Sequence, residues 1–256
     1  MNGRGPRSPV ARAFRVLSWM VATDAEDWGL GEVARAVGMH PSTCHRVLGV
    51  LEAEGLVAQD IESGRYGLGL EFWHLAWTAA HRRTMADIAL PHLRWLTEQT
   101  GETTWLGLYD INTKDMMWVA TVDSPHPIRF VQPLYQRLPV HAGAMGRAIL
   151  AFLPESERAA VLKRPLARRT PHTVTDSGPL EEVLEDVRSK GYAISVGEQF
   201  EGGVGIAAPV RGRDGRLLAA VGIGLPMQRY RPEDEARLAE LVMTCAREIA
   251  KSAGRA

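Results

Sequence analysis

The segment HPSTCHRVLGVLEAEGL, His40–Leu56, gathers side chains that could carry chemistry at the start of one helical pattern. His40, Cys44 and His45 are of the types that bind zinc, whereas Arg46 is typical of a helix that contacts DNA. A zinc site needs three or four ligands, and His40 and Cys44 supply two at best on the apolar side. No CxxC, HxxxH or acidic cluster nearby offers the others. We therefore expect no metal and interpret Cys44 as a small buried residue.

The opposite face of the same helical pattern is polar. At 3.6 residues per turn, Ser42 and Arg46 share this face, with Thr43 and His45 on its flanks. Arg46 can pair with a guanine edge or a phosphate, and the other three can donate to phosphates or bases. Pro41 suits the first helical turn, because its missing N–H would be unpaired there anyway. A short helix, a tight turn and this helix predict a helix-turn-helix.

Charge leaves an alternative open, namely an ordinary three-helix bundle with a solvated polar face. Residues 1–80 hold seven arginines, no lysine and nine acids, whereas DNA binding favours positive charge. Four of these arginines, Arg12 among them, crowd the N-terminus. Arg46 and Arg65 fall on the expected DNA side, and we expect Arg65 at the tip of a hairpin, where a wing would touch the sugar-phosphate backbone or the minor groove. The order of the motifs, more than the charge, favours DNA binding.

The elements that position this face form a compact N-terminal unit. Apolar spacing predicts helices over residues 10–21, 30–37 and 41–55, with TDAEDWG as a break after the first. The stretch LVAQDIESGRYGLG predicts a hairpin. Residues 70–81 are apolar on most sides and predict a connecting helix that packs against a neighbour.

The remainder predicts a second domain of mixed helices and strands, antiparallel in part, so that the fold class is α+β. Pro91 is expected to kink or restart the helix that follows residue 82. The predicted strands are TTWLGLYD, DMMWVATV, YAISV, VGIAAPV and LLAAVGIGL, and the predicted helices are HAGAMGRAILAFL, 154–162, 179–190 and 232–251.

Composition excludes several classes of protein. At 256 residues the chain can form one or two domains, and its 30 basic and 30 acidic residues balance. Two cysteines far apart suggest no disulfide framework. No apolar run approaches the roughly 20 residues that cross a bilayer, and the arginine-rich start does not resemble a secretory signal. We expect a cytoplasmic protein.

The sequence resembles the IclR family of bacterial transcriptional regulators over nearly its whole length. The N-terminal part carries STCHRVLGVLEAEGLV with GRYGLG, and the C-terminal part carries DSPHPIR, HAGAMGRAILA, KGYAIS, GVGIAAPV and GRLLAAVGIGLP. The resemblance implies a winged helix-turn-helix domain (1–69), a linker helix (70–83) and a GAF-like effector-binding domain (84–256). It also implies a homodimer, often a homotetramer, on a palindromic operator in double-stranded DNA.

The resemblance places a small-molecule effector against HAGAMG and the strands VGIAAPV and AAVGIGLP. Free N–H groups at a helix start attract an anionic or carbonyl group, and Gly143, Ala144 and Gly146 would let a ligand approach that backbone. Gly146 is explained equally well by close helix–sheet packing.

Four positions depart from the polar contacts of well-known family members. Where those often carry an aspartate, a cysteine and two serines, this chain has Ser195, Gly205, Gly222 and Gly224. We therefore expect a roomier pocket with fewer polar side chains.

By the same alignment Phe130 and Met145 line the pocket, with Trp105 and Trp118 as further candidates. Apolar walls with few polar anchors suit an aromatic ring, so we expect an aromatic acid, amide or related derivative rather than glyoxylate or pyruvate. Glu198 matches a commonly acidic position and could orient the ligand or pair with an arginine.

The leading hypothesis is a ligand-responsive regulator, with repression expected although activation would use the same parts. The effector would change the angle between the domains, or the oligomeric state, through the linker helix. One rival is an enzyme acting on a small carbonyl compound, for which His126 and His141 are the tempting residues. Neither GxSxG nor a P-loop is present, and no cofactor is expected. Another rival is an architectural DNA-binding protein whose second domain only oligomerises.

Overall fold

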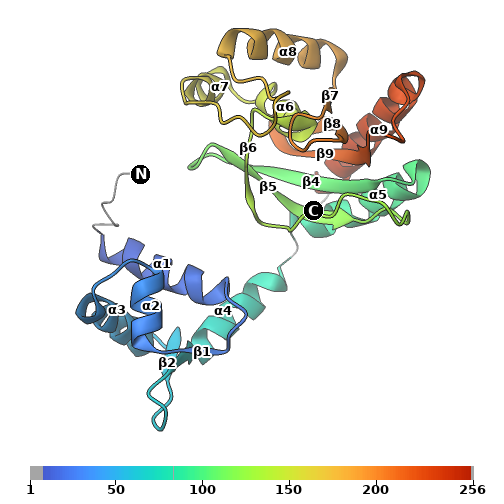
Figure 1. Cartoon of the computed structure of the whole chain (residues 1–256). Coiled ribbons are helices and arrows are strands. Elements are labelled where there is room, and N and C mark those ends of the chain that lie inside the picture. The colour runs from blue at the N-terminus through green and yellow to red at the C-terminus, as the bar shows by residue number, and fades with distance from the viewer. Residues whose placement is uncertain (1–7, 83, 255–256) are drawn as a thin grey trace. The chain divides into compact units, whose positions relative to one another are not determined.

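The computed structural model describes residues 8–82 and 84–254. The chain forms two compact units, residues 1–83 and 84–256 (Figure 1). This division assigns the segment 70–83, expected as a linker, to the first unit.

The first unit combines helices with a small antiparallel sheet in which β3 lies between β1 and β2. The expected helices and hairpin are present. TDAEDWG, expected only as a break, contains β1, which pairs with β3 through Asp27–Gly67 and Trp28–Tyr66. The elements are α1 (Pro9–Val21), β1 (Asp27–Trp28), α2 (Leu30–Ala36), α3 (Pro41–Ala53), β2 (Val57–Gln59), β3 (Tyr66–Leu68) and α4 (Leu70–Ala80).

The core of the first unit fixes which face of α3 is exposed. Val33 of α2 and Cys44 and Leu48 of α3 are fully buried in one cluster. Gly38 adopts a φ of +65° just after α2, a conformation that glycine tolerates without the steric penalty of a Cβ. The chain can therefore turn sharply into α3 and present that helix's opposite face to solvent.

The second unit is a curled six-stranded antiparallel sheet with strand order β6-β5-β4-β9-β8-β7. Short β6 was not predicted, because three residues give no clear alternation. The elements are α5 (Met85–Thr100), β4 (Thr103–Asp110), β5 (Asp115–Val122), β6 (Arg137–Pro139), α6 (Gly143–Leu150), α7 (Glu155–Leu162), α8 (Ser177–Lys190), β7 (Ala193–Val196), β8 (Gly203–Arg211), β9 (Leu217–Pro226), the 3-10 turn η1 (Pro232–Asp234) and α9 (Glu235–Ala253).

Alternating side chains give the sheet two buried faces. Ile206 and Val221 point into a core shared with α5 and α9. Trp105, Ala207 and Ala220 belong to a second core shared with α6 and α8, on the other side of the sheet (Figure 1). The second core surrounds the start of α6.

Helix α5 does not restart at Pro91, which was one of the two alternatives predicted for this residue. Helix α5 runs from Met85 to Thr100 with Pro91 inside it. Pro91 and Asp87, whose carbonyl loses its usual N–H partner, are both exposed. That carbonyl can therefore reach water, which reduces the penalty of a proline inside the helix.

Candidate functional site

Helix α3 presents the polar face that its sequence predicted. Ser42, His45 and Arg46 are exposed and Thr43 is half-buried, while the apolar side of the helix faces the core. A Cβ added to Gly49 would have no atom within 4 Å. The exposed face is therefore open to a large partner such as a duplex.

The start of α3 is organised by His40, which caps the helix rather than belonging to it. Its Nδ1 accepts a hydrogen bond from the Ser42 backbone N–H at 3.4 Å and lies 2.8 Å from the Ser42 hydroxyl. Pro41 occupies the first helical position, as expected, and is exposed. The capping contact with His40 orients the Ser42 side chain.

Cys44 lies on the buried side of α3, away from the polar face. It is fully buried, and burial raises the pKa of its thiol. Within residues 8–82 and 84–254, no three His, Cys, Asp or Glu side chains group closely enough to hold a metal ion.

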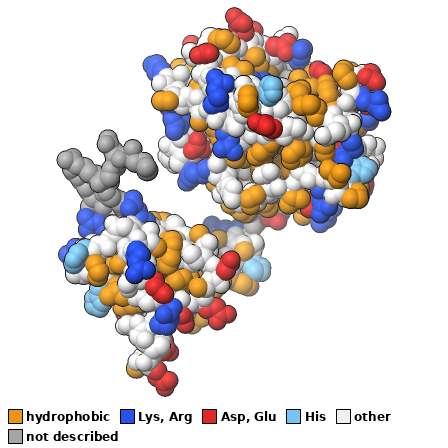
Figure 2. Space-filling model, viewed as in Figure 1, with side chains coloured by type: hydrophobic (Ala, Val, Ile, Leu, Met, Phe, Trp, Pro, Cys, Tyr) orange, Lys and Arg blue, Asp and Glu red, His pale blue; other side chains and the backbone are white. Residues whose placement is uncertain are grey.

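Arg65 differs from its expected position at the hairpin tip. Its Nε donates to Asp27 Oδ1 at 2.5 Å, and its Nη2 donates to Glu32 at 3.1 Å and to the Asp27 carbonyl at 3.1 Å. The turn itself carries the exposed acids Asp60 and Glu62, and acidic side chains mark the end of the hairpin in Figure 2. Phosphate repels these carboxylates, so the tip is not a basic wing.

Arg12 lies on α1 and is half-buried. It is not free of interactions within the chain. The predicted DNA-contacting residues therefore fall into two groups: those on the exposed face of α3, and Arg12 and Arg65, which lie off that helix.

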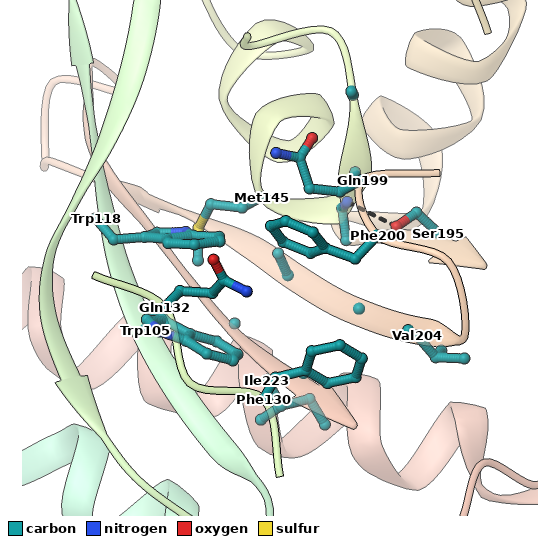
Figure 3. Close-up of a pocket in the computed structure, with 18 of the residues that line it drawn as sticks. Trp105, Trp118, Phe130, Gln132, Met145, Ser195, Gln199, Phe200, Val204 and Ile223 are labelled. Carbon is teal, nitrogen blue, oxygen red and sulfur yellow. Dashed lines mark hydrogen bonds between the residues drawn. The ribbon is translucent and has the colours of Figure 1, made fainter. Parts of the chain in front are cut away.

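The second unit contains a cavity at the start of α6, between that helix and the sheet (Figure 3). It brings together nine of the ten predicted effector residues. These are Trp105, Trp118, Phe130, Ala144, Met145, Ser195, Gly205, Gly222 and Gly224.

Aromatic rings from four segments surround this cavity. Trp105 and Trp118 stack with ring centroids 5.3 Å apart, and Phe200 lies 6.2 Å from Trp118 and 6.3 Å from Phe130. Gln132 adds a side-chain amide to the lining, drawn close to the two indoles in Figure 3. The walls are thus π-faces and methyl groups, with a few amide and hydroxyl groups among them.

The glycines do not leave the cavity roomy, contrary to expectation. A Cβ on Gly224 would lie 2.5 Å from Cζ3 of Trp105, and one on Gly222 would lie 2.6 Å from the Ile206 carbonyl oxygen. The space without side chains is therefore filled by an indole ring and by neighbouring backbone. The cavity measures about 70 Å³, less than the roughly 150 Å³ that takes up benzene in an engineered core.

Gly146 is absent from the cavity wall among the described residues. A Cβ there would lie 2.5 Å from the carbonyl oxygen of Val140. Close packing of α6 against the preceding chain therefore explains Gly146.

Few polar side chains reach the cavity, as the sequence predicted. The Ser195 hydroxyl accepts a hydrogen bond from the Ala144 backbone N–H at 3.0 Å. Gln199 is 8% exposed, and neither its Nε2 nor its Oε1 has a hydrogen-bond partner within the described residues. The indole N–H groups of Trp105 and Trp118 are likewise buried without a partner there.

Gln199 and Phe200 were not predicted to line the cavity. They lie on the loop between β7 and β8, where Gly197 and Gly202 have positive φ angles of 69° and 71°. Their place directly after Glu198 was the only signal in the sequence. The turns that flank such a loop set the direction of its side chains, and the sequence does not show that direction. Met116 and Gln132 also line the cavity unpredicted.

Glu198 is the tenth predicted residue and does not line the cavity. It forms a buried ion pair with Nη2 of Arg147 on α6. Burial raises the pKa of Glu198 although Arg147 opposes that change, and burial lowers the pKa of Arg147 although Glu198 opposes it. Of the two roles left open for Glu198, pairing with an arginine is the one observed.

His141 has a structural partner. Its Nε2 lies 3.0 Å from the carbonyl oxygen of Ala167, and burial lowers the pKa of its ring. No helix within the described ranges is long and apolar enough to span a membrane.

Two family models together match most of the chain. The model described as "IclR helix-turn-helix domain" matches residues 9–60. The model described as "Bacterial transcriptional regulator IclR C-terminal" matches residues 77–251.

Individual proteins match over nearly their full length. The glycerol operon regulatory protein of Streptomyces griseus is 34% identical over 89% of this chain and 87% of that protein. The HTH-type transcriptional regulator KdgR of Escherichia coli is 30% identical over 96% and 93%, respectively.

Solved structures agree in fold. An IclR homologue from Microbacterium hydrocarbonoxydans, complexed with 4-hydroxybenzoate, superposes with a TM-score of 0.80 at 27% identity, covering 97% of this chain and 100% of that one. The Thermotoga maritima IclR gives a TM-score of 0.72 at 28% identity, covering 96% and 98%.

Proposed function

Because the chain belongs to the IclR family of bacterial transcriptional regulators, we propose that it senses an aromatic acid or amide and so controls DNA binding by α3. Family membership makes the chain a regulator with a helix-turn-helix and an effector-binding domain, and not an enzyme. The proposal concerns which residues do this, which effector they take and how the chains assemble.

The exposed face of α3 is the proposed reader of DNA. Arg46 supplies a fork of donors for a guanine edge or a phosphate, and Ser42, Thr43 and His45 add shorter donors beside it. The open surface at Gly49 supports close approach by a DNA backbone. Arg65 serves instead as a brace that ties β3 to β1 and α2.

The ring of aromatic side chains around the start of α6 is the observation that carries the effector proposal. Trp105, Trp118, Phe130 and Phe200 offer π-faces on several sides of one cavity, and such faces favour a flat ligand. Because the cavity of about 70 Å³ is smaller than one that takes up benzene, the proposal requires the side chains that line it to move apart when the ring binds. That the Microbacterium relative was solved with 4-hydroxybenzoate supports the same class.

The first unit has an apolar surface suited to a second copy. Helix α4 buries none of its residues within the described chain, although several are large and apolar. Trp73 is 57% exposed and Trp77 is 62% exposed. Phe14 of α1 is 67% exposed. We propose a homodimer through α1 and α4, with a tetramer through the second units, that reads a palindromic operator in the cytoplasm as a repressor.

Signal transfer is assigned to the segment 70–83, which joins the two units. A coupling of about 1–3 kcal/mol between effector and DNA is enough for a useful change in occupancy. A ligand that favours one dimer geometry would shift the spacing of the two α3 helices on the operator.

Gel shifts with the DNA upstream of the chain's own gene test the proposal. The protein should retard this DNA, and benzoate, 4-hydroxybenzoate or benzamide should change the retarded fraction, whereas pyruvate and glyoxylate should not. A response to the keto acids with none to the aromatic compounds would refute the effector class. Failure to retard any upstream fragment would refute the DNA-binding assignment.

A further inference from the structure

We propose that the cavity selects an uncharged aromatic carboxamide over the corresponding carboxylate. This rests on the proposed function, because it names the chemical form of the aromatic effector at the same site. The feature that carries it is the buried side-chain amide of Gln199 in a cavity that offers no cation.

Among the described residues that line the cavity, none is Lys, Arg or His. Arg147, a buried cation on α6, is paired with Glu198. A carboxylate placed between indoles and methyl groups would lose its hydration with no opposite charge to replace it. A carboxamide carries the same ring and the same shape without that penalty.

Helix α6 begins at the cavity, and its N-terminus is the feature that would favour an anion. The Ala144 N–H, however, already donates to the Ser195 hydroxyl. The indole N–H groups of Trp105 and Trp118 do not distinguish the two ligands, since each can donate to a carboxamide oxygen as well as to a carboxylate.

Gln199 makes the distinction, because its amide has a buried acceptor as well as a buried donor. Both Nε2 and Oε1 lie without a hydrogen-bond partner within the described part of the chain. A ligand carboxamide satisfies both, its oxygen accepting from Nε2 and its N–H donating to Oε1. A carboxylate has no hydrogen to offer Oε1, and its lone pairs would face that oxygen's own. The two hydrogen bonds can also form if the Gln199 side-chain amide is rotated so that Oε1 and Nε2 exchange places, because the ligand amide can rotate in the same way.

The position of Gln199 is set by the backbone around it. Gly143 has a φ of +76°, and a Cβ there would lie 3.0 Å from Cβ of Gln199. The lack of a side chain at the start of α6 therefore lets the Gln199 stem pack against that backbone. Figure 3 shows the amide end of Gln199 near the start of α6, above the ring of Phe200 in this view. A group held in this way recognises a ligand with little loss of side-chain freedom.

Calorimetry on the full-length protein at pH 7 with benzamide, benzoate and methyl benzoate tests the inference. Benzamide should bind at least tenfold tighter than benzoate, which is charged, and than methyl benzoate, which is neutral but has no N–H. Benzoate binding as tightly as benzamide overturns the inference and leaves the aromatic class standing. Methyl benzoate equalling benzamide also overturns it, because the N–H would then be irrelevant. Binding of none of the three refutes the proposed aromatic effector itself.

Gln199→Met supplies the second readout, with Gln136→Met as the matched control. Gln136 is exposed and does not line the cavity. The preference for benzamide over methyl benzoate should fall from tenfold or more to within about threefold in Gln199→Met, since one apolar side chain replaces the donor and the acceptor. It should stay unchanged in Gln136→Met. A preference retained in Gln199→Met would contradict the assignment, whatever the change in absolute affinity.

Discussion

The ion pair between Arg147 and Glu198 shows how burial decides what a charged residue does. Burial shifts both pKa values toward the neutral forms, so it outweighs the attraction between the two charges. The Arg147 Nε has no hydrogen-bond partner within the described residues. Such a pair contributes little net stability, yet the loss of one member leaves the other charge buried alone.

Glu198→Gln should therefore lower the free energy of unfolding by about 3–5 kcal/mol, as measured by urea denaturation. Glu201→Gln is the matched control, because Glu201 is exposed on the same loop, and it should change stability by less than about 0.5 kcal/mol. The double variant Arg147→Met with Glu198→Leu should recover most of the loss. A single variant as stable as wild type would show that the pair is not desolvated in solution.

At the scale of elements, β4 and β9 share the cavity floor through one aromatic side chain and one glycine. Trp105 pairs with Gly222 across the two strands, and its indole covers Gly224. The indole also stacks on Trp118, so it has little freedom to move aside.

Gly224→Ala should destabilise the second unit by about 1–3 kcal/mol through overpacking, and should shift the tryptophan fluorescence as the indole moves. It should also weaken binding of the aromatic effector. Gly178→Ala is the control, because a Cβ there has open space in α8, and it should leave stability unchanged or slightly raised. Wild-type melting and fluorescence in Gly224→Ala would refute this packing.

The sequence predicted those elements that depend on the pattern of neighbouring residues, and missed those that depend on contacts with distant segments. Helix α3 and strands β4 and β5 follow from apolar periodicity. Two-residue β1 depends on its partner β3, and no local pattern reports that pairing. Most of the predicted cavity residues lie on helices and strands, although Met116 of β5 was missed. Gln199 and Phe200 were missed because the turns of their loop direct them. Trp105 was predicted at the site, but not that its ring fills the space above Gly224, since that depends on the register of β4 with β9.

For the whole molecule, oligomerisation is proposed to follow from the apolar side chains on α1 and α4. Trp73→Glu should convert a dimer into monomers in size-exclusion chromatography with light scattering, because a carboxylate in an apolar interface loses its hydration. Its affinity for a palindromic site should fall with dimerisation. Ile61→Glu is the control, since Ile61 is 99% exposed at the hairpin turn. A Trp73→Glu protein that stays dimeric would place the interface elsewhere.

Fluorescence anisotropy of labelled upstream DNA with the Arg46→Ala protein tests most directly whether α3 is the DNA-reading element. The loss of the guanidinium should weaken binding by about 1–3 kcal/mol, roughly fivefold to 150-fold at fixed salt. Calorimetric binding of the effector should not change. Arg213→Ala, an exposed residue of the second unit, should bind DNA within about twofold of wild type. Undiminished DNA affinity in Arg46→Ala would contradict the placement of α3 on the duplex.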